Sequence, residues 1–104
     1  MYARLVTGSI SPDLIDQAIQ IWMDNVLPSA QQQKGFRNVR LLVNREKGRI
    51  ASMALWETEA DFQATVEWNQ DQISRFTGLF SVPPVVEGYE LVVQADRGDL
   101  DAPL

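Results

Sequence analysis

Residues 49–62, RIASMALWETEADF, decide the fold of this chain. The first half of the stretch, residues 50–56, is a short apolar run with the length and composition of a buried strand. Thr58 then starts a capping-box pattern, with Asp61 three positions after it, which predicts the start of a helix. The stretch is therefore expected to be a strand followed by a helix. Trp56 would end the strand, at the mouth of the space between a sheet and its covering helix.

Three other segments have the composition of strands. These apolar runs cover residues 2–7, 36–44 and 85–93. The charged turn at residues 45–48 ends in glycine and joins the second run to the stretch above, so a β-hairpin is expected there. Inside the last run, Glu87 and Gly88 suggest a β-bulge.

Two segments have the 3.6-residue periodicity of amphipathic helices. In the first, Ser11 is the expected N-cap and Pro12 the first helical residue, while Pro28 is expected to kink or end the helix. The buried face of this helix is expected to contain Leu14, Ile15, Ala18, Ile19, Trp22, Met23 and Val26. A second helix is expected over residues 59–76, with a buried stripe that mixes apolar and polar residues: Phe62, Thr65, Val66, Asn69, Ile73 and Phe76.

The expected order of elements is β-α-β-β-α-β. This is the ferredoxin-like arrangement, an α+β fold in which two helices cover one face of a four-stranded antiparallel sheet. The second and third strands are apolar at neighbouring positions, whereas a sheet that is wet on one side alternates more regularly. We therefore expect the uncovered face to pack on a second copy of the chain in a homodimer. The domain is expected to cover residues 1–93, and the acidic segment 94–104 is expected to fray.

The composition excludes several classes of protein. The 104 residues contain no histidine and no cysteine, which excludes a Ser-His-Asp or Cys-His mechanism, a zinc–thiolate site and a His-ligated haem within this chain. No metal and no cofactor are expected. The net charge of -5, without a basic stripe, argues against nucleic acid and anionic membranes as partners. No apolar run approaches the ~18 residues that span a bilayer and no signal peptide is present, so a cytoplasmic protein is expected.

With this topology, residues 2–93 resemble the antibiotic biosynthesis monooxygenase (ABM) group of dimeric α/β-barrel proteins. The resemblance rests on MYARLVTGSI as the opening strand, on a long first helix that ends in Gly35 before FRNVRLLVN, and on ASMALWETEADF. It implies a homodimer whose sheets face each other, with a ligand space between each sheet and its own helices. Haem degraders of this group carry an Asn on the first strand and an iron-ligating His on the second helix. This chain has no histidine, and Arg75 lies near that helical position.

Quinone-forming oxygenases of the group carry an Asn four residues before the strand-end Trp and a Tyr six residues after it. Those positions hold Ser52 and Phe62 in this chain, and Trp56 is retained. The resemblance implies a cofactor-independent monooxygenase that acts on an aromatic or phenolic compound. The alternative is a non-catalytic, dimeric ligand-binding or regulatory protein, and a structural dimer with a filled core is a third possibility.

No catalytic residue is assigned from the sequence. The expected contacts of an aromatic ligand are Trp56, Ser52, Phe62, Asn69 and Arg75. Trp56 is expected to pack on one side and to face a modest cavity on the other. Asn69 is expected either to point into that cavity or to bond to backbone or a buried water. Trp22 is expected in the core, and Arg4 is expected to be solvated or paired with a carboxylate across a dimer interface.

Overall fold

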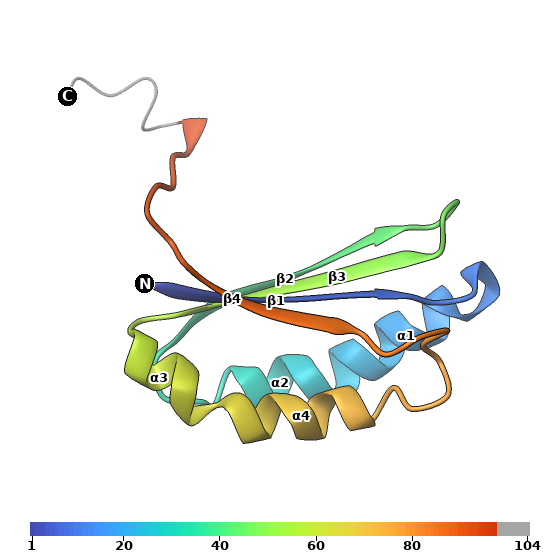
Figure 1. Ribbon diagram of the computed structural model, residues 1–104, viewed down its shortest axis with the longest axis horizontal. Coiled ribbons are helices and arrows are strands. Elements are labelled where there is room, and N and C mark those ends of the chain that lie inside the picture. Colours follow the sequence, from blue (N-terminus) through green and yellow to red (C-terminus); the bar gives the residue numbers. More distant parts are fainter. Residues whose placement is uncertain (98–104) are drawn as a thin grey trace.

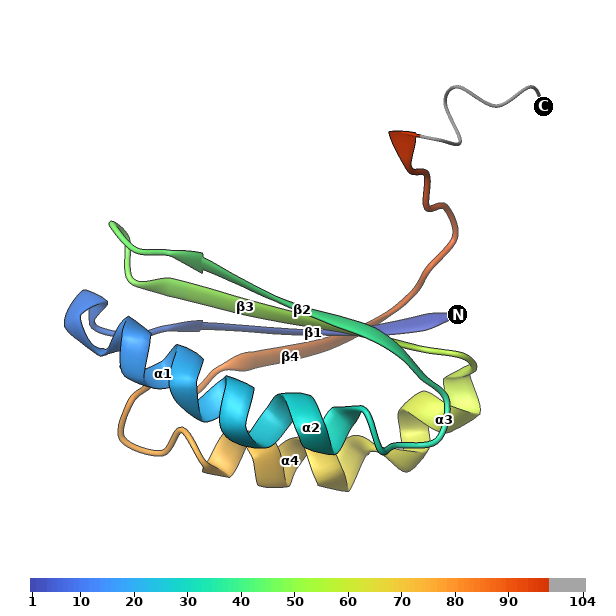
Figure 2. The same cartoon turned by 180° about the vertical axis from the view of Figure 1, so that it is seen from behind.

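The computed structural model of the protein describes residues 1–97. Its sheet has the strand order β2-β3-β1-β4, with every pair antiparallel. All helices lie against one face of this sheet (Figures 1 and 2). In chain order the elements are β1 (Tyr2–Ser9), a 3-10 turn (Pro12–Leu14), α1 (Ile15–Ile21), a π-helical turn (Trp22–Val26), α2 (Leu27–Ala30), β2 (Phe36–Asn44), β3 (Arg49–Trp56), α3 (Glu59–Ala64), α4 (Val66–Ser74) and β4 (Val85–Glu90).

This arrangement confirms the predicted ferredoxin-like α+β fold. The four strands and the hairpin turn between β2 and β3 are found near their predicted positions, but β4 ends at Glu90, whereas the sequence predicts a strand to residue 93. Most of the expected C-terminal tail, residues 98–104, lies outside the described residues. Within residues 1–97, no helix is long and apolar enough to cross a membrane.

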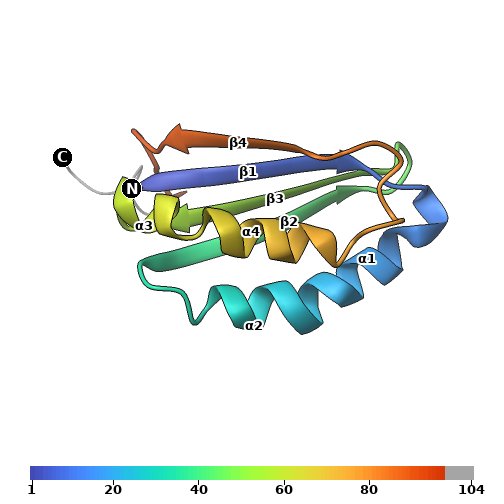
Figure 3. The same ribbon diagram turned by 60° about the horizontal axis from the view of Figure 1, so that its bottom comes forward.

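Alternation along the strands decides which side chains meet the helices. The register pairs Arg4 with Ala54 and Val6 with Ser52, and these residues face the helices. Figure 3 shows α4 lying beside α1 and α2 beneath the strands. The main core lies between these layers and consists of Ile10, Ile15, Ala18, Trp22, Val26, Ile50 and Phe76.

The first helical segment continues past Pro28, which the sequence predicts as its kink or end. A proline inside a helix lacks an N–H and crowds the carbonyl of the preceding turn. The wider π-helical turn just before it accommodates this defect, because the Leu27 N–H bonds to the Trp22 carbonyl five residues back. Trp22 and Val26 take the inward positions of that turn, so Met23, predicted on the buried face, is half exposed. Ser11 precedes the helix as predicted, but its side chain caps no backbone N–H.

The sequence predicts one helix over residues 59–76, but the structure has two, which meet at Thr65. The Thr65 backbone leaves the helical conformation at φ -104° and ψ 11°. Its hydroxyl donates to the Phe62 carbonyl at 2.8 Å, a local bond that competes with continuing the helix. The Arg4 side chain of β1 donates to both groups, to Thr65 Oγ1 at 3.1 Å and to the Phe62 oxygen at 3.0 Å. On α4, Val66 is exposed and Gln72 is buried. The buried residues Phe62, Thr65, Gln72 and Phe76 have the spacing of one helical face.

Gly88 has a packing role instead of the predicted bulge. The β4 register is regular at this point, since Glu87 pairs with Leu5 and Gly88 with Arg4. A Cβ atom on Gly88 would lie 2.7 Å from Phe62 Cζ, so the glycine makes room for the Phe62 ring. The predicted cap after β3 is confirmed, because Thr58 Oγ1 accepts the Asp61 N–H at 3.0 Å.

Candidate functional site

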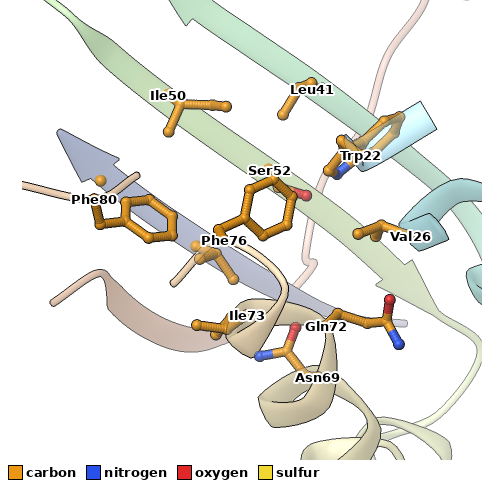
Figure 4. Close-up of a pocket in the computed structure, with 12 residues that line it drawn as sticks. Trp22, Val26, Leu41, Ile50, Ser52, Asn69, Gln72, Ile73, Phe76 and Phe80 are labelled. Atoms are coloured by element: carbon orange, nitrogen blue, oxygen red, sulfur yellow. The ribbon is translucent and has the colours of Figure 1, made fainter. Parts of the chain in front are cut away.

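A cavity of about 50 Å³ lies between the sheet and the helices (Figure 4). Its walls come from β1, β2, β3, the π-helical turn, α4 and the segment after α4. The lining residues are Val6, Gly8, Trp22, Val26, Leu41, Ile50, Ser52, Asn69, Gln72, Ile73, Phe76 and Phe80. A water molecule needs roughly 10–15 Å³ of such space, and a cavity of about 150 Å³ takes up benzene. The cavity therefore has room for a few water molecules as it stands, and a ring compound would have to widen it.

Small residues on the helix side of the sheet create this space. Ser52 lies in the middle of β3, in register with Val6 on one side and Leu41 on the other. A large aliphatic side chain at that position would fill the cavity. Gly8 has a different role on β1, because a Cβ atom there would overlap the Phe80 ring at Cε1. The Phe80 ring thus packs directly on the β1 backbone and closes one end of the cavity.

Four side chains bring polar groups to an otherwise apolar wall: Ser52, Asn69, Trp22 and Gln72. Trp22 is 9% exposed and Gln72 is 6% exposed. Trp22 Nε1 and Gln72 Oε1 are buried, and neither has a hydrogen-bond partner among residues 1–97. An unpaired buried polar group costs about 1–3 kcal/mol. Both atoms have almost no accessible surface, so neither is open to a molecule in the cavity as the structure stands.

The cavity has no acid or base on its wall. All of the lining residues within the described part of the chain are neutral at every accessible pH. Residues 1–97 also contain no group of three or more acidic side chains that could hold a metal ion. The arrangement can bind a guest, orient it and exclude water, but no lining side chain can carry a proton to or from it.

Known proteins resemble this chain both in sequence and in fold. No family model matches the sequence. Two uncharacterized proteins of Mycobacterium tuberculosis strain H37Rv are similar in sequence: Rv2557, 33% identical over 91 residues, and Rv2558, 37% identical over 93 residues. The matches cover 88% and 89% of this chain, which spans 41% and 39% of the length of these relatives.

Solved structures show a likeness over nearly the whole domain. One is an antibiotic biosynthesis monooxygenase, with a TM-score of 0.70, 14% identity, and coverage of 89% of this chain and 100% of that one. Another is the monooxygenase from the gene ActVA-Orf6 of Streptomyces coelicolor in complex with the ligand Nanaomycin D, with a TM-score of 0.70, 13% identity, and coverage of 90% and 92%. The chain has the fold of the antibiotic biosynthesis monooxygenases. The resemblance stated from the sequence is confirmed at the level of this ABM fold.

Within the ABM fold, the cavity brings together two of the five predicted ligand contacts, Ser52 and Asn69. Trp56 is fully buried in a neighbouring aromatic cluster, with ring centroids 5.9 Å from Phe36 and 5.9 Å from Trp68. Among residues 1–97, it is not part of the cavity wall. The expected mixture of packing and cavity at Trp56 is therefore replaced by core packing, on the same helix-covered face of the sheet as the cavity but at the end of β3.

The other two predicted contacts also lie elsewhere. Phe62 is buried against Tyr2, with ring centroids 4.7 Å apart. Arg75 is exposed at the end of α4, where its Nη1 lies 3.4 Å from Asn25 Oδ1. Neither residue lines the cavity in the described part of the chain.

Arg4 is a buried cation, contrary to the expectation of a solvated or interface arginine. It is 2% exposed, and its Cζ lies 4.3 Å from the Phe62 ring centroid and 6.0 Å from that of Trp56. The ion pairs within residues 1–97 are Arg37–Glu57 and Arg45–Asp16, so Arg4 has no carboxylate partner there. Burial lowers the pKa of Arg4 from its usual value to about 10, which still leaves the guanidinium charged near neutral pH.

Sequence reasoning missed two polar residues of the cavity, Trp22 and Gln72. Trp22 has the spacing of a core residue and is buried as predicted, but its indole N–H has no hydrogen-bond partner among residues 1–97. Gln72 is not among the residues predicted on the buried stripe, yet it lies three positions after Asn69 and four before Phe76, which is the spacing of one helical face. This spacing is the signal that could have found it.

Proposed function

We propose that this protein binds a small aromatic molecule in the cavity beneath its sheet. The observation that carries the proposal is the cavity itself, with an apolar wall and a few converging polar groups from Ser52, Asn69, Trp22 and Gln72. This combination is the usual form of a small-molecule site. An uncharged wall favours an uncharged guest, because burying a charge without a partner is costly.

Phe76 and Phe80 give the guest a way to enlarge the cavity. Their ring centroids are 6.0 Å apart, and both rings also line an outer groove beside residues 81–84. Rotation of the Phe80 ring would join the cavity to this groove. Phe80 follows Gly78, whose φ of 89° and open surroundings leave the connecting backbone free to adjust.

Titration of the purified protein with small aromatic compounds tests the proposal. Trp22 lies on the cavity wall, so we expect a saturable change in tryptophan fluorescence and a one-to-one adduct by native mass spectrometry. A Ser52→Val variant serves as the matched control, because its side chain would occupy the space beside Val6. Fluorescence and an unfolding midpoint that no aromatic compound alters in the wild-type protein would reject the proposal.

A cofactor-independent monooxygenase is the second candidate function. The ABM fold that the chain shares with the Streptomyces coelicolor monooxygenase favours it. Oxidation of a phenol to a quinone by one O₂, with water as the other product, takes all four electrons from the substrate and needs no cofactor. The cavity would position the substrate and exclude water. The electrons would come from the ionised form of the substrate itself. An oxygen electrode tests this candidate by measuring O₂ uptake in the presence of the protein and a phenolic compound. If the compound binds but O₂ uptake does not exceed the autoxidation of the free compound, the monooxygenase is rejected and the binding function remains.

We also propose that the chain forms a homodimer through the uncovered sheet face. The proposal is supported by apolar side chains there, including Leu5, Met53 and the exposed Leu42. A stable interface of this kind buries on the order of 2,000 Å². Met53→Lys is expected to yield monomers in sedimentation, whereas Met23→Lys, on the helical surface, is expected to leave the dimer intact. A wild-type protein that sediments only as a monomer of 11.7 kDa at micromolar concentration contradicts this assembly.

A further inference from the structure

Residues 91–95, here called the arm, have the composition of a strand but lie off the sheet. The ladder between β1 and β4 ends where the Leu91 N–H donates to the Met1 carbonyl at 3.0 Å. The next two residues, Val92 and Val93, are 78% and 79% exposed. Valine favours the pleated, half-buried setting of a sheet, so the arm has the side chains of a strand without a neighbour to pair with.

An apolar groove of about 350 Å³ lies at the opposite edge of the sheet, between β2 and the first helical segment. Its lining residues are Ile19, Trp22, Met23, Leu27, Val39, Leu41 and Val43. Within residues 1–97, β2 pairs with β3 alone, so the N–H and C=O groups along its outer edge have no strand beside them. An extended segment that adds a strand at such an edge gains main-chain hydrogen bonds and a groove for every second side chain.

The charges of the two edge strands are complementary. β2 carries Arg37 and Arg40 and no acidic residue, whereas β4 carries Glu87 and Glu90 and no basic residue. Two β2 edges would therefore repel each other, as would two β4 edges, and a meeting of unlike edges is favoured. Arg40 is exposed and belongs to neither ion pair of residues 1–97, so a carboxylate of another chain can approach it.

The side chains of the arm fit both faces of the β2 edge. Consecutive residues of a strand point to opposite faces, so Val93 can enter the groove while Val92 lies on the other face. The β2 side chain on that other face is Leu42, which is 54% exposed. Addition of the arm would therefore remove all three aliphatic side chains from water.

We propose that the arm of one copy adds as a strand to the β2 edge of a second copy, with Val93 in the groove. The inference rests on the homodimer proposed above, because the chain after β4 leaves the sheet on the face without helices, where the second copy would lie (Figures 1 and 2). Each copy gives one arm and receives one, so the exchange closes at two chains. The sheet faces hold the two copies together, and loss of the arm leaves the dimer intact.

Cross-linking tests the exchange in the full chain, which has no cysteine of its own. A double variant, Val93→Cys with Met23→Cys, places one thiol on the arm and one beside the groove. Both native side chains are more than half exposed, so neither substitution disturbs the core. With a short bismaleimide we expect a covalent dimer as the main product on a denaturing gel. The matched control pairs Val93→Cys with Val66→Cys, whose thiol lies on α4 away from the groove, and should give only a trace of it.

Amide hydrogen exchange tests the same contact without cysteine. In the wild-type dimer we expect slow exchange at residues 92–95, because their N–H groups lie in the new ladder. Val93→Asp would bury a carboxylate in the apolar groove, so this variant should lose the slow exchange. Val93→Ile keeps an apolar, β-branched side chain and should retain it. Sedimentation should show a dimer for all three proteins.

The outcomes separate the exchange from the homodimer. A dimer that gives no cross-link and exchanges residues 92–95 rapidly overturns the exchange and keeps the sheet-face dimer. A cross-link within one chain, detected by mass after denaturation, shows that the arm folds onto its own β2 and also overturns the exchange. Slow exchange on β2 together with rapid exchange at residues 92–95 means that another segment occupies the groove, with the same consequence. If the wild-type protein sediments only as a monomer, both proposals fail.

Discussion

Substitutions of Trp56 test whether this side chain belongs to the packed core or to a ligand site. The side chain is fully buried, contacts Phe36 and Trp68 edge-to-face, and leaves its own Nε1 without a partner in the described chain. Truncating a large buried aromatic side chain to alanine typically costs about 3–5 kcal/mol. Because the ring is packed on its cluster and does not face the cavity, we expect Trp56→Ala to show the full core cost, above the roughly 1–3 kcal/mol that a half-packed ring would show.

Trp56→Phe should behave very differently. The change removes a few ring atoms, at a loss of roughly 1–2 kcal/mol of apolar burial. It also removes an unpaired buried N–H, which relieves a penalty of about 1–3 kcal/mol. The two effects offset each other, so we expect the free energy of unfolding to change by less than about 1 kcal/mol.

Urea unfolding, followed by far-UV circular dichroism at several denaturant concentrations, measures both variants. Trp68→Phe is the matched control. The Trp68 indole N–H donates to Ser29 Oγ at 2.6 Å, so Trp68→Phe removes a hydrogen bond. It should therefore lower the free energy of unfolding more than Trp56→Phe does, although Trp68 is less buried than Trp56. The reasoning is refuted if Trp56→Ala costs under about 2 kcal/mol, or if Trp56→Phe costs as much as Trp56→Ala.

Three further substitutions test the framework around the site. Arg4→Met removes a buried cation that has no counter-ion, which relieves a desolvation cost, but it also removes the hydrogen bonds of Arg4. The Thr65–Phe62 bond remains. The two effects oppose each other, so the unfolding free energy should stay within about 1.5 kcal/mol of wild type. Because the folded pKa of Arg4 is lowered to about 10, the unfolded chain binds more protons than the folded one above about pH 10. The stability of wild type relative to Arg4→Met should therefore rise with pH in that range, and a fall measured by urea unfolding contradicts this. Thr58→Ala loses the helix cap and should cost about 1 kcal/mol, whereas Thr58→Ser should not; equal midpoints for both argue against the cap. Gly88→Ala forces a Cβ onto the Phe62 ring and should lower the unfolding free energy by about 1–3 kcal/mol; an unchanged thermal midpoint contradicts that contact.

Features that depend on neighbouring residues could be predicted from the sequence. Strand β3, the hairpin before it and the Thr58 cap each follow from a few consecutive residues, and the structure has all three. The element order then leaves few topologies to choose from, and the ferredoxin-like sheet is one of them. Ser52 and Asn69 were found for a similar reason, since their strand and helix phases place them on the inner face.

Features that depend on distant residues could not be predicted. At the helix break, Thr65 accepts a hydrogen bond from Arg4, which is 61 positions away in the sequence. No local pattern pairs these two residues. Gly88 likewise has no local explanation, because the Phe62 ring that requires it comes from another element. The burial of Arg4 thus depends on a contact between β1 and the second helical layer that no local pattern reveals.

The chemistry of the cavity wall also weighs between the two proposed functions. An uncharged wall favours the protonated form of a phenolic guest, because burial without a counter-charge disfavours the phenolate and raises the pKa of the hydroxyl. A monooxygenase without a cofactor needs the opposite, an ionised and electron-rich substrate. Arg4 is a buried cation on the helix side of β1, but its guanidinium is engaged by Thr65 and Phe62 and does not line the cavity. Binding of phenol should therefore weaken as the pH approaches the phenol pKa of about 10. Tighter binding of the phenolate would instead indicate that Arg4 turns toward the guest, and it would favour oxidation over recognition.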